Sequence, residues 1–455
     1  MAIACLMTKH SRITRDCRTI LWQSRVRLLL SMILLVFALP VWSDSPSYSI
    51  QQVNFSGLKR TNPTWLIEYT GLSCPCRLSA EDIDSIRLKL LTTQVFQSVS
   101  VQLQVASDTP DFYTLEIDVN EKWTIIPVVR GAFGGGTPLI VAGIYDTHTF
   151  GSLWTLGAES RTFGSAPTGG VIWIRAPRWL AGHHYLNFEL WQDNRIRSVY
   201  DREDKEVART YGSATAALVE ALQPLGRDGK GPWQLGLRLH SRQQQTLEWQ
   251  KQKLDLPPIE FDFEPINQKR LLARLVYDDM AVQQQNLQGI RFLISAGPSW
   301  SGKKYQRSLE QELFWYRLWD RDWNLSFHEW LGLSDDRSYQ SLYFLGGFDS
   351  VRGLPDGVMY GNKAVYANLE LRKIFYRSTY ASWQAAAYTD YGTAAFSTRE
   401  WADHDRLSGG IGVRIAVPQV NRLVFRVDYA WSLDRPKTSS ISVGMNQFID
   451  PYRPL

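Results

Sequence analysis

Two kinds of hydrophobic periodicity divide the chain. Up to about residue 122, helical spacing occurs beside short alternating segments, whereas from Trp123 onward segments of about ten residues alternate apolar with polar positions. In residues 233–240, Trp and Leu alternate with Gln, Gly, Arg and His. Alternation over many short segments, divided by turns rich in Gly, Pro, Asp and Asn, is typical of a transmembrane antiparallel β-barrel. One face of each strand would meet lipid and the other would line a polar lumen.

Roughly sixteen such segments can be counted, an even number as bacterial single-chain barrels prefer. The clearest are the last five, near residues 364–375, 381–394, 406–417, 421–432 and 438–448. After Ser43 no stretch has the roughly 18 consecutive apolar residues that mark a transmembrane helix. A closed barrel is therefore the membrane-spanning arrangement that the sequence predicts.

Residues 48–122 predict a smaller α+β domain with the order strand, helix, helix, strand, strand. Asn62 suits the N-cap of the first helix, with Pro63 at its first position and Gly71 after its end. Ser79 opens a capping box for the second helix. Alternating residues over 98–105 and 115–119 predict the last two strands. We therefore expect a domain at 44–123, followed by the barrel at 124–455.

An apolar run at 28–39, behind Arg25 and Arg27, is too short to span a bilayer and is typical of a signal peptide. We expect residues 1–43 to be cleaved after Ser43, so that the mature chain begins at Asp44. This segment carries six Lys or Arg residues and one Asp, which accounts for the formal charge of +5 and leaves the mature chain neutral. Net charge thus gives no support to a nucleic-acid partner.

Two cysteines, Cys74 and Cys76, remain in the mature chain as a Cys-Pro-Cys turn. They could be two structural thiols or a local disulfide, form a bridge to another chain, or, least favoured, bind a metal, because two thiolates alone make a poor zinc site. No Gly-x-Ser-x-Gly, P-loop or HExxH motif is present, and the histidines are scattered. We therefore expect neither an enzyme, nor a cofactor, nor a metal site.

The connection between Asp335 and Asn362 is too glycine-rich for a strand and too long for a bare turn, and loops of this length usually have a task. Arg352 lies within it. On two of the strands that follow, alternation places Asp390 and Glu370 on the lumen side. An arginine on a loop can bind such carboxylates bidentately. The ion pair could hold the loop in the position that its function requires, or it could be purely structural and only close the pore.

Two parts of the sequence resemble known families. The order of elements in the N-terminal domain, with Asn54-Phe55-Ser56-Gly57 early and residues 95–99 closing the second helix, resembles a POTRA domain. Gly346-Gly347 and Val351-Arg352-Gly353 resemble the BamA/TamA superfamily, in which the sixth extracellular loop folds into the lumen. Leu354 stands where that family has an aromatic residue.

The resemblance implies three further features. The arginine should pair with an aromatic-x-Asp-x-Gly motif, which Tyr388, Asp390 and Gly392 fit, with Glu370 as a second carboxylate. The last strand should carry an aromatic terminal signal, which Gly444 and Phe448 fit. Seven residues follow Phe448, and we expect this tail to hang in the periplasm.

The resemblance also implies a function: an outer-membrane assembly or insertion factor that templates β-strands at a lateral barrel seam. Its partners would be unfolded outer-membrane or secreted proteins, outer-membrane lipids, and periplasmic chaperones or accessory proteins that bind the POTRA domain. The alternatives are a two-partner secretion translocator and a passive pore. A lumen filled by the loop argues against the pore.

Overall fold

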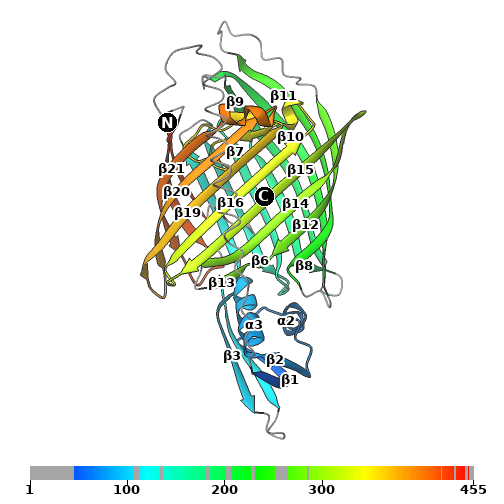
Figure 1. Ribbon diagram of the computed structural model, residues 1–455, viewed down its shortest axis with the longest axis vertical. Coiled ribbons are helices and arrows are strands. Elements are labelled where there is room, and N and C mark those ends of the chain that lie inside the picture. Colours follow the sequence, from blue (N-terminus) through cyan, green and yellow to red (C-terminus); the bar gives the residue numbers. More distant parts are fainter. Residues whose placement is uncertain are drawn as a thin grey trace, which may run out of the picture.

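The computed structural model describes residues 46–105, 112–133, 137–179, 184–200, 206–226, 231–251, 265–283, 286–421, 423–434, 437–445 and 449. The expected signal peptide and cleavage point lie outside these residues. Figure 1 shows a tall barrel of tilted strands with a small α/β unit at one end. Within the part of the chain that the structure describes, no helix is long and apolar enough to cross a membrane.

The α/β unit precedes the barrel and consists of one small sheet and two helices. Its elements are β1 (Ser47–Ser56), α2 (Pro63–Thr70), β2 (Cys76–Ser79), α3 (Ala80–Thr92), β3 (Phe96–Val105) and β4 (Tyr113–Glu121). The sheet order is β2-β1-β4-β3, with β1 and β4 parallel. The helix caps predicted at Asn62 and Ser79 are confirmed. Strand β2 was not predicted, because four residues are too few to show an alternation.

The barrel begins directly after the unit. Its strands are β5 (Ile125–Phe133), β6 (Leu139–Thr149), β7 (Trp154–Phe163), β8 (Gly169–Trp179), β9 (His184–Tyr200), β10 (Glu206–Pro224), β11 (Trp233–Lys251), β12 (Ile266–Asp278), β13 (Ala281–Gln283), β14 (Asn286–Ser301), β15 (Lys304–Trp319), β16 (Trp323–Ser334), β19 (Lys363–Arg377), β20 (Ser382–Ala395), β21 (Arg406–Ala416), β22 (Val424–Ser432) and β23 (Ser439–Met445). The short β13 shares the place of β12, since both pair with β14. The described residues thus form a closed barrel of sixteen strand positions, which confirms the predicted barrel.

The two faces of the barrel wall differ as the alternation predicts. On β11, Leu235, Leu237 and Leu239 are half exposed on the outside, while Arg238 points inward to an ion pair with Glu220 of β10. The outer face can therefore meet lipid, and the inner face carries polar and charged side chains.

The contact that closes the barrel is short in the part of the chain that the structure describes. Among the described residues, β23 pairs with β5 over three residue pairs, from Ile441 with Phe133 to Val443 with Gly131. The neighbouring contacts of β22 with β23 and of β5 with β6 cover seven and eight pairs. We call the contact between β23 and β5 the seam.

Ile449, the described residue of the tail that follows Phe448, lies inside the barrel, and the rest of the tail expected in the periplasm lies outside the described residues. Ile449 is 2% exposed and packs with Leu293 and Phe314, and its carbonyl accepts a hydrogen bond of 2.8 Å from the Tyr316 hydroxyl. Phe314 and Tyr316 lie on a strand on the far side of the barrel from the seam. An apolar side chain is stabilised in this cluster, because burial removes it from water.

The α/β unit docks onto the turn between β6 and β7. Arg60 forms an ion pair of 3.0 Å with Asp146, and the Asn62 N–H donates to the Gly151 carbonyl at 3.1 Å. Leu153 of the same turn is 7% exposed and belongs to the hydrophobic core of the unit. The unit and the barrel therefore share part of one core.

The segment at the base of this interface is held by Glu121. Its carboxylate accepts the N–H groups of Arg60 and Thr61 at 3.0 Å each. Burial acts to raise the pKa of Glu121, but the hydrogen bonds outweigh it and lower the pKa below its usual value.

Candidate functional site

The loop between β16 and β19 folds into the barrel. It contains the 3-10 turn η2 (Tyr339–Ser341) and a two-stranded ribbon of β17 (Tyr343–Leu345) and β18 (Met359–Gly361). The tip is closed by a hydrogen bond of 3.0 Å from the Gly347 N–H to the Leu354 carbonyl. Gly347 has φ 68°, in the left-handed region that favours glycine. Val351 and Leu354 are fully buried.

Arg352 contacts both carboxylates that alternation places on the lumen side. Its Nε and Nη2 donate to Asp390 Oδ2 and Oδ1 at 2.8 and 2.9 Å, and its backbone N–H donates to Oδ2 at 3.1 Å. Its Nη1 donates to Glu370 Oε2 at 3.0 Å. All three side chains are at most 2% exposed. The arginine is thus held by a bidentate pair and a second carboxylate at once.

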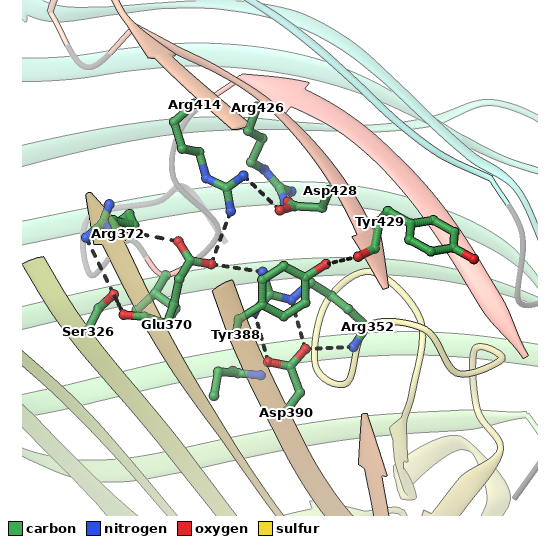
Figure 2. Close-up of polar contacts among 12 residues, drawn as sticks. Ser326, Arg352, Glu370, Arg372, Tyr388, Asp390, Arg414, Arg426, Asp428 and Tyr429 are labelled. Atoms are coloured by element: carbon green, nitrogen blue, oxygen red, sulfur yellow. Dashed lines mark hydrogen bonds and ion pairs between the residues drawn. The ribbon is translucent and has the colours of Figure 1, made fainter. Parts of the chain in front are cut away.

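The contacts continue as a chain of alternating charges across four barrel strands (Figure 2). Glu370 Oε2 also accepts from Arg414 at 3.1 Å, Arg414 Nη1 lies 2.7 Å from Asp428 Oδ1, and Arg426 Nη1 lies 2.7 Å from Asp428 Oδ2. Because every charge has an opposite neighbour, the network avoids the large penalty of a lone buried charge.

The sequence placed Arg426 and Asp428 on the face opposite the apolar residues of their strand but did not predict this network. Which residues meet across strands depends on the register and tilt of the barrel. Alternation alone could have found the inward face of Arg414, Arg426 and Asp428, but not their partners.

Tyr388 forms a platform under the arginine. Its ring centre lies 3.4 Å from the Arg352 guanidinium carbon, and its hydroxyl donates to the Tyr429 carbonyl at 3.0 Å (Figure 2). A Cβ atom at Gly410 would lie 2.3 Å from the Tyr388 ring, so the absence of a side chain there gives the ring its place. The ring adds a cation–π contact to the ion pairs.

Gly392 and Leu354 explain how the loop tip fits. A Cβ atom at Gly392 would lie 2.7 Å from Val351 Cγ2, so this glycine makes room for the loop. Leu354 packs with Leu345 and Met359 in a buried apolar cluster. At the position where the resemblance implies an aromatic residue, this chain therefore uses aliphatic packing.

The loop is also bound to the opposite wall, which the sequence did not predict. The Tyr339 hydroxyl lies 2.7 Å from Thr210 Oγ1 of β10, Arg242 Nη1 of β11 donates to the Gln340 carbonyl at 3.2 Å, and the Arg197 guanidinium of β9 lies 3.9 Å above the Phe344 ring. These partners lie 98 residues or more before the loop residues that they contact. Their pairing leaves no local pattern in the sequence.

Of the two residues of the predicted terminal signal, Gly444 faces the lumen beside Arg130 and Arg426. A Cβ atom there would lie 3.4 Å from Arg130 Cγ and 3.5 Å from Arg426 Nε. Phe448 lies outside the described residues.

The Cys74 and Cys76 thiols are free, with their sulfurs 2.8 Å apart. Burial, together with the hydrogen bond to Cys76, raises the pKa of Cys74 to about 12. Cys74 is therefore a poor nucleophile near neutral pH. Among the described residues, no group of three or more His, Cys, Asp or Glu side chains could hold a metal ion.

Comparison with known proteins places this site in a family domain. Residues 287–449 match the Omp85 superfamily domain, and this range contains the loop and all strands of the charge network. No curated protein matches the sequence. The loop and strand motifs that resemble the BamA/TamA superfamily all lie within the matched domain, which supports that resemblance.

Solved structures show the same architecture. The chain is similar to CdiB from Acinetobacter baumannii, with a TM-score of 0.60 at 13% identity over 88% of this chain and 74% of that one. It is also similar to CdiB from Escherichia coli, with a TM-score of 0.53 at 11% identity over 97% and 100% of the two chains. BamA from Haemophilus ducreyi lacking POTRA domains 1–3 gives a TM-score of 0.49 at 14% identity over 88% and 85% of the two chains.

The fold and the domain match together define a class, the closed outer-membrane-type barrel with an inward-folded loop. Within this class, the match is to the Omp85 superfamily, which points to the outer membrane.

Proposed function

We propose that this protein assembles or inserts β-rich outer-membrane proteins by pairing an incoming strand at the seam. The observation that carries the proposal is the length of the seam, three residue pairs among the described residues against seven and eight beside it. Fewer ladder hydrogen bonds make this the contact that opens first. An opened edge offers unpaired N–H and C=O groups to another strand.

In this proposal the α/β unit is a POTRA domain in the periplasm, with residues 44–123 in front of a barrel at 124–455. Its edge strand β3 would receive unfolded clients or accessory proteins by the same strand addition. The outer face of the barrel contacts outer-membrane lipids. The activity is non-covalent and requires neither a catalytic residue nor a cofactor.

A disulfide across the seam tests the proposal. Ala132 and Ser442 are paired there, so Ala132→Cys with Ser442→Cys, in a background where Cys74 and Cys76 are Ser, should lock the seam on oxidation. We expect the locked protein to stop assembling outer-membrane proteins in cells and to recover with a reductant. The measurement is the folded fraction of outer-membrane β-barrels, read by heat-modified gel mobility.

The matched control uses the other neighbour of the same residue. Ala132→Cys with Leu139→Cys links β5 to β6, a contact that the proposal keeps closed, so oxidation should have no effect. If the oxidised seam variant keeps full activity, incoming strands do not pair at the contact between β23 and β5, and the proposal is wrong.

Depletion of the protein in its host, followed by outer-membrane proteomics, separates the proposal from its alternative. Loss of many β-barrel proteins from the outer membrane supports an assembly factor. Loss of a single secreted protein, with the barrel proteins unchanged, would replace it with a two-partner secretion translocator.

A further inference from the structure

The tip of the inward loop is hydrogen-bonded to the last strand of the barrel. The Gly353 N–H donates to Ser440 Oγ at 3.1 Å, and Thr438 Oγ1 donates to the Gly353 carbonyl at 2.7 Å. Ser440 lies on β23 and Thr438 directly precedes it. Both peptide groups that flank Gly353 are therefore bound by hydroxyls from one short segment.

The approach of the loop to this segment requires a glycine. Gly353 has φ 84°, and a Cβ atom on it would lie 2.9 Å from the Trp431 nitrogen and 3.1 Å from the Ala430 carbonyl carbon of β22. Any side chain would push the tip away from the wall and stretch both hydrogen bonds. The contact is thus a close fit between loop and strand backbone.

The segment that the tip holds is one side of the seam. Ser440 immediately precedes Ile441, which among the described residues is the first of β23 that pairs with β5. The described pairing of β23 with β5 has three residue pairs, so two additional hydrogen bonds are a larger share of what holds β23 in place than they would be for a strand with a long pairing.

The other side of the tip is fixed to the wall. Arg352, one residue before Gly353, is bound by Asp390 and Glu370. The backbone N–H of Arg352 also donates to Asp390 Oδ2 at 3.1 Å, and the next N–H along the chain, that of Gly353, donates to Ser440. A displacement of the tip backbone therefore disturbs both contacts, which connects the charge network to the seam strand through two adjacent peptide groups.

We propose that Thr438 and Ser440 are positioning residues that form a latch between the loop tip and β23. With Arg352 in its carboxylate pair, the latch holds β23 against β5. When the loop tip withdraws, β23 loses both hydroxyl contacts and the seam is free to open. The use of an open seam by clients rests on the proposed function, whereas the latch itself does not.

Hydrogen–deuterium exchange of the purified full-length protein tests the latch without any client. The double variant Thr438→Val, Ser440→Ala should raise the exchange rate of residues 439–445 and of β5 by roughly tenfold, the effect of losing about two hydrogen bonds. Exchange in β14 and β15, on the far side of the barrel, should stay unchanged. Heat-modified gel mobility confirms that the barrel is folded.

Two controls separate a latch from general damage. Ser432→Ala removes a buried hydroxyl from β22 that has no hydrogen-bond partner among the described residues, so seam exchange should match wild type. Thr438→Ser with Ser440→Thr keeps both hydroxyls and should restore slow exchange. Equal exchange in the double variant and in Ser432→Ala would overturn the latch.

Arg352→Ala tests the coupling itself. It should raise seam exchange as much as the double variant does, and combining the two should add little, because both break one connection. Wild-type seam exchange in Arg352→Ala would overturn the coupling. A functional latch in a protein without assembly activity would instead contradict only the proposed function.

Discussion

At the scale of single residues, we expect substitutions in the charge network to lower the stability of the folded protein strongly. Arg352, Glu370 and Asp390 are each at most 2% exposed, and Arg352 donates hydrogen bonds to both carboxylates. Truncating Arg352 leaves Asp390 as a buried charge without its cation, and truncating Asp390 leaves Arg352 with only Glu370, which it shares with Arg414. The penalty of such an undercompensated buried charge exceeds the net gain from forming the pair.

Arg352→Ala and Asp390→Ala should therefore have similar defects. We expect each to lower stability by about 3 kcal/mol or more if the site is dry, and to impair assembly while the barrel remains inserted. The double variant should be little worse than either single one. The measurements are the temperature of the heat-modified gel transition and the folded fraction of client barrels.

Arg377→Ala is the matched control. Its ion pair with Asp322 has a similar length, 3.2 Å, but both side chains are more than 40% exposed, so its removal should cost less than about 1 kcal/mol. Strictly additive defects of Arg352→Ala and Asp390→Ala would show that the two residues act separately.

At this scale the sequence predicted which side chains face the lumen but not which of them meet. Period-two alternation fixes the inward face of Asp390 and Glu370. The partner of Arg414, by contrast, follows from the stagger between strands, which alternation does not contain. The contacts between the loop and Arg197 or Arg242 were missed for the same reason.

At the scale of elements, alternation predicts long strands well and short ones poorly. Strands β19 to β22 lie within about three residues of the predicted segments, whereas β2, β13, β17 and β18 have three or four residues each and show no pattern. The fit between the loop and β20 depends on Gly392. The sequence shows this glycine, but only the structure shows that it makes room for Val351 of the loop.

Gly392→Ala should push Val351 out of its site, since the new Cβ atom would lie 2.7 Å from Val351 Cγ2. Overpacking of this kind costs about 1–3 kcal/mol, and we expect a matching fall in the gel transition temperature. Val351→Ala in the same chain should recover most of the loss by removing the clashing methyl groups. Absence of any rescue would mean that the loop tip lies elsewhere.

At the scale of the whole molecule, the boundary between unit and barrel is less sharp than the sequence predicts. The periodicity of the sequence changes from helical to alternating near Trp123, and the first barrel strand, β5, begins at Ile125. Leu153, however, lies in the core of the unit although it belongs to a barrel turn. A contact made by a turn carries no periodicity, so it could not be predicted.

A fragment of residues 44–122 should still fold, because the other buried residues of its core lie within it. We expect a mixed α/β circular dichroism spectrum and cooperative unfolding in urea. The site of Leu153 is open to water in the fragment, so it should be less stable than the unit in the whole chain. Leu90→Ala, at a fully buried position, should lower its stability by about 2–5 kcal/mol. A random-coil spectrum would contradict an independent domain.

The attachment of the inward loop to both walls has a mechanical consequence. A barrel that loses its closing contact becomes a curled sheet, and a curled sheet is free to flatten. Here the loop ties β10 and β11 to β19 and β20 across the interior, through Tyr339 and Gln340 on one side and Arg352 on the other. The loop therefore holds these two walls of the barrel at a fixed separation. If the contact between β23 and β5 opens, we expect the strands near it to move apart while the other strands stay curved around the loop.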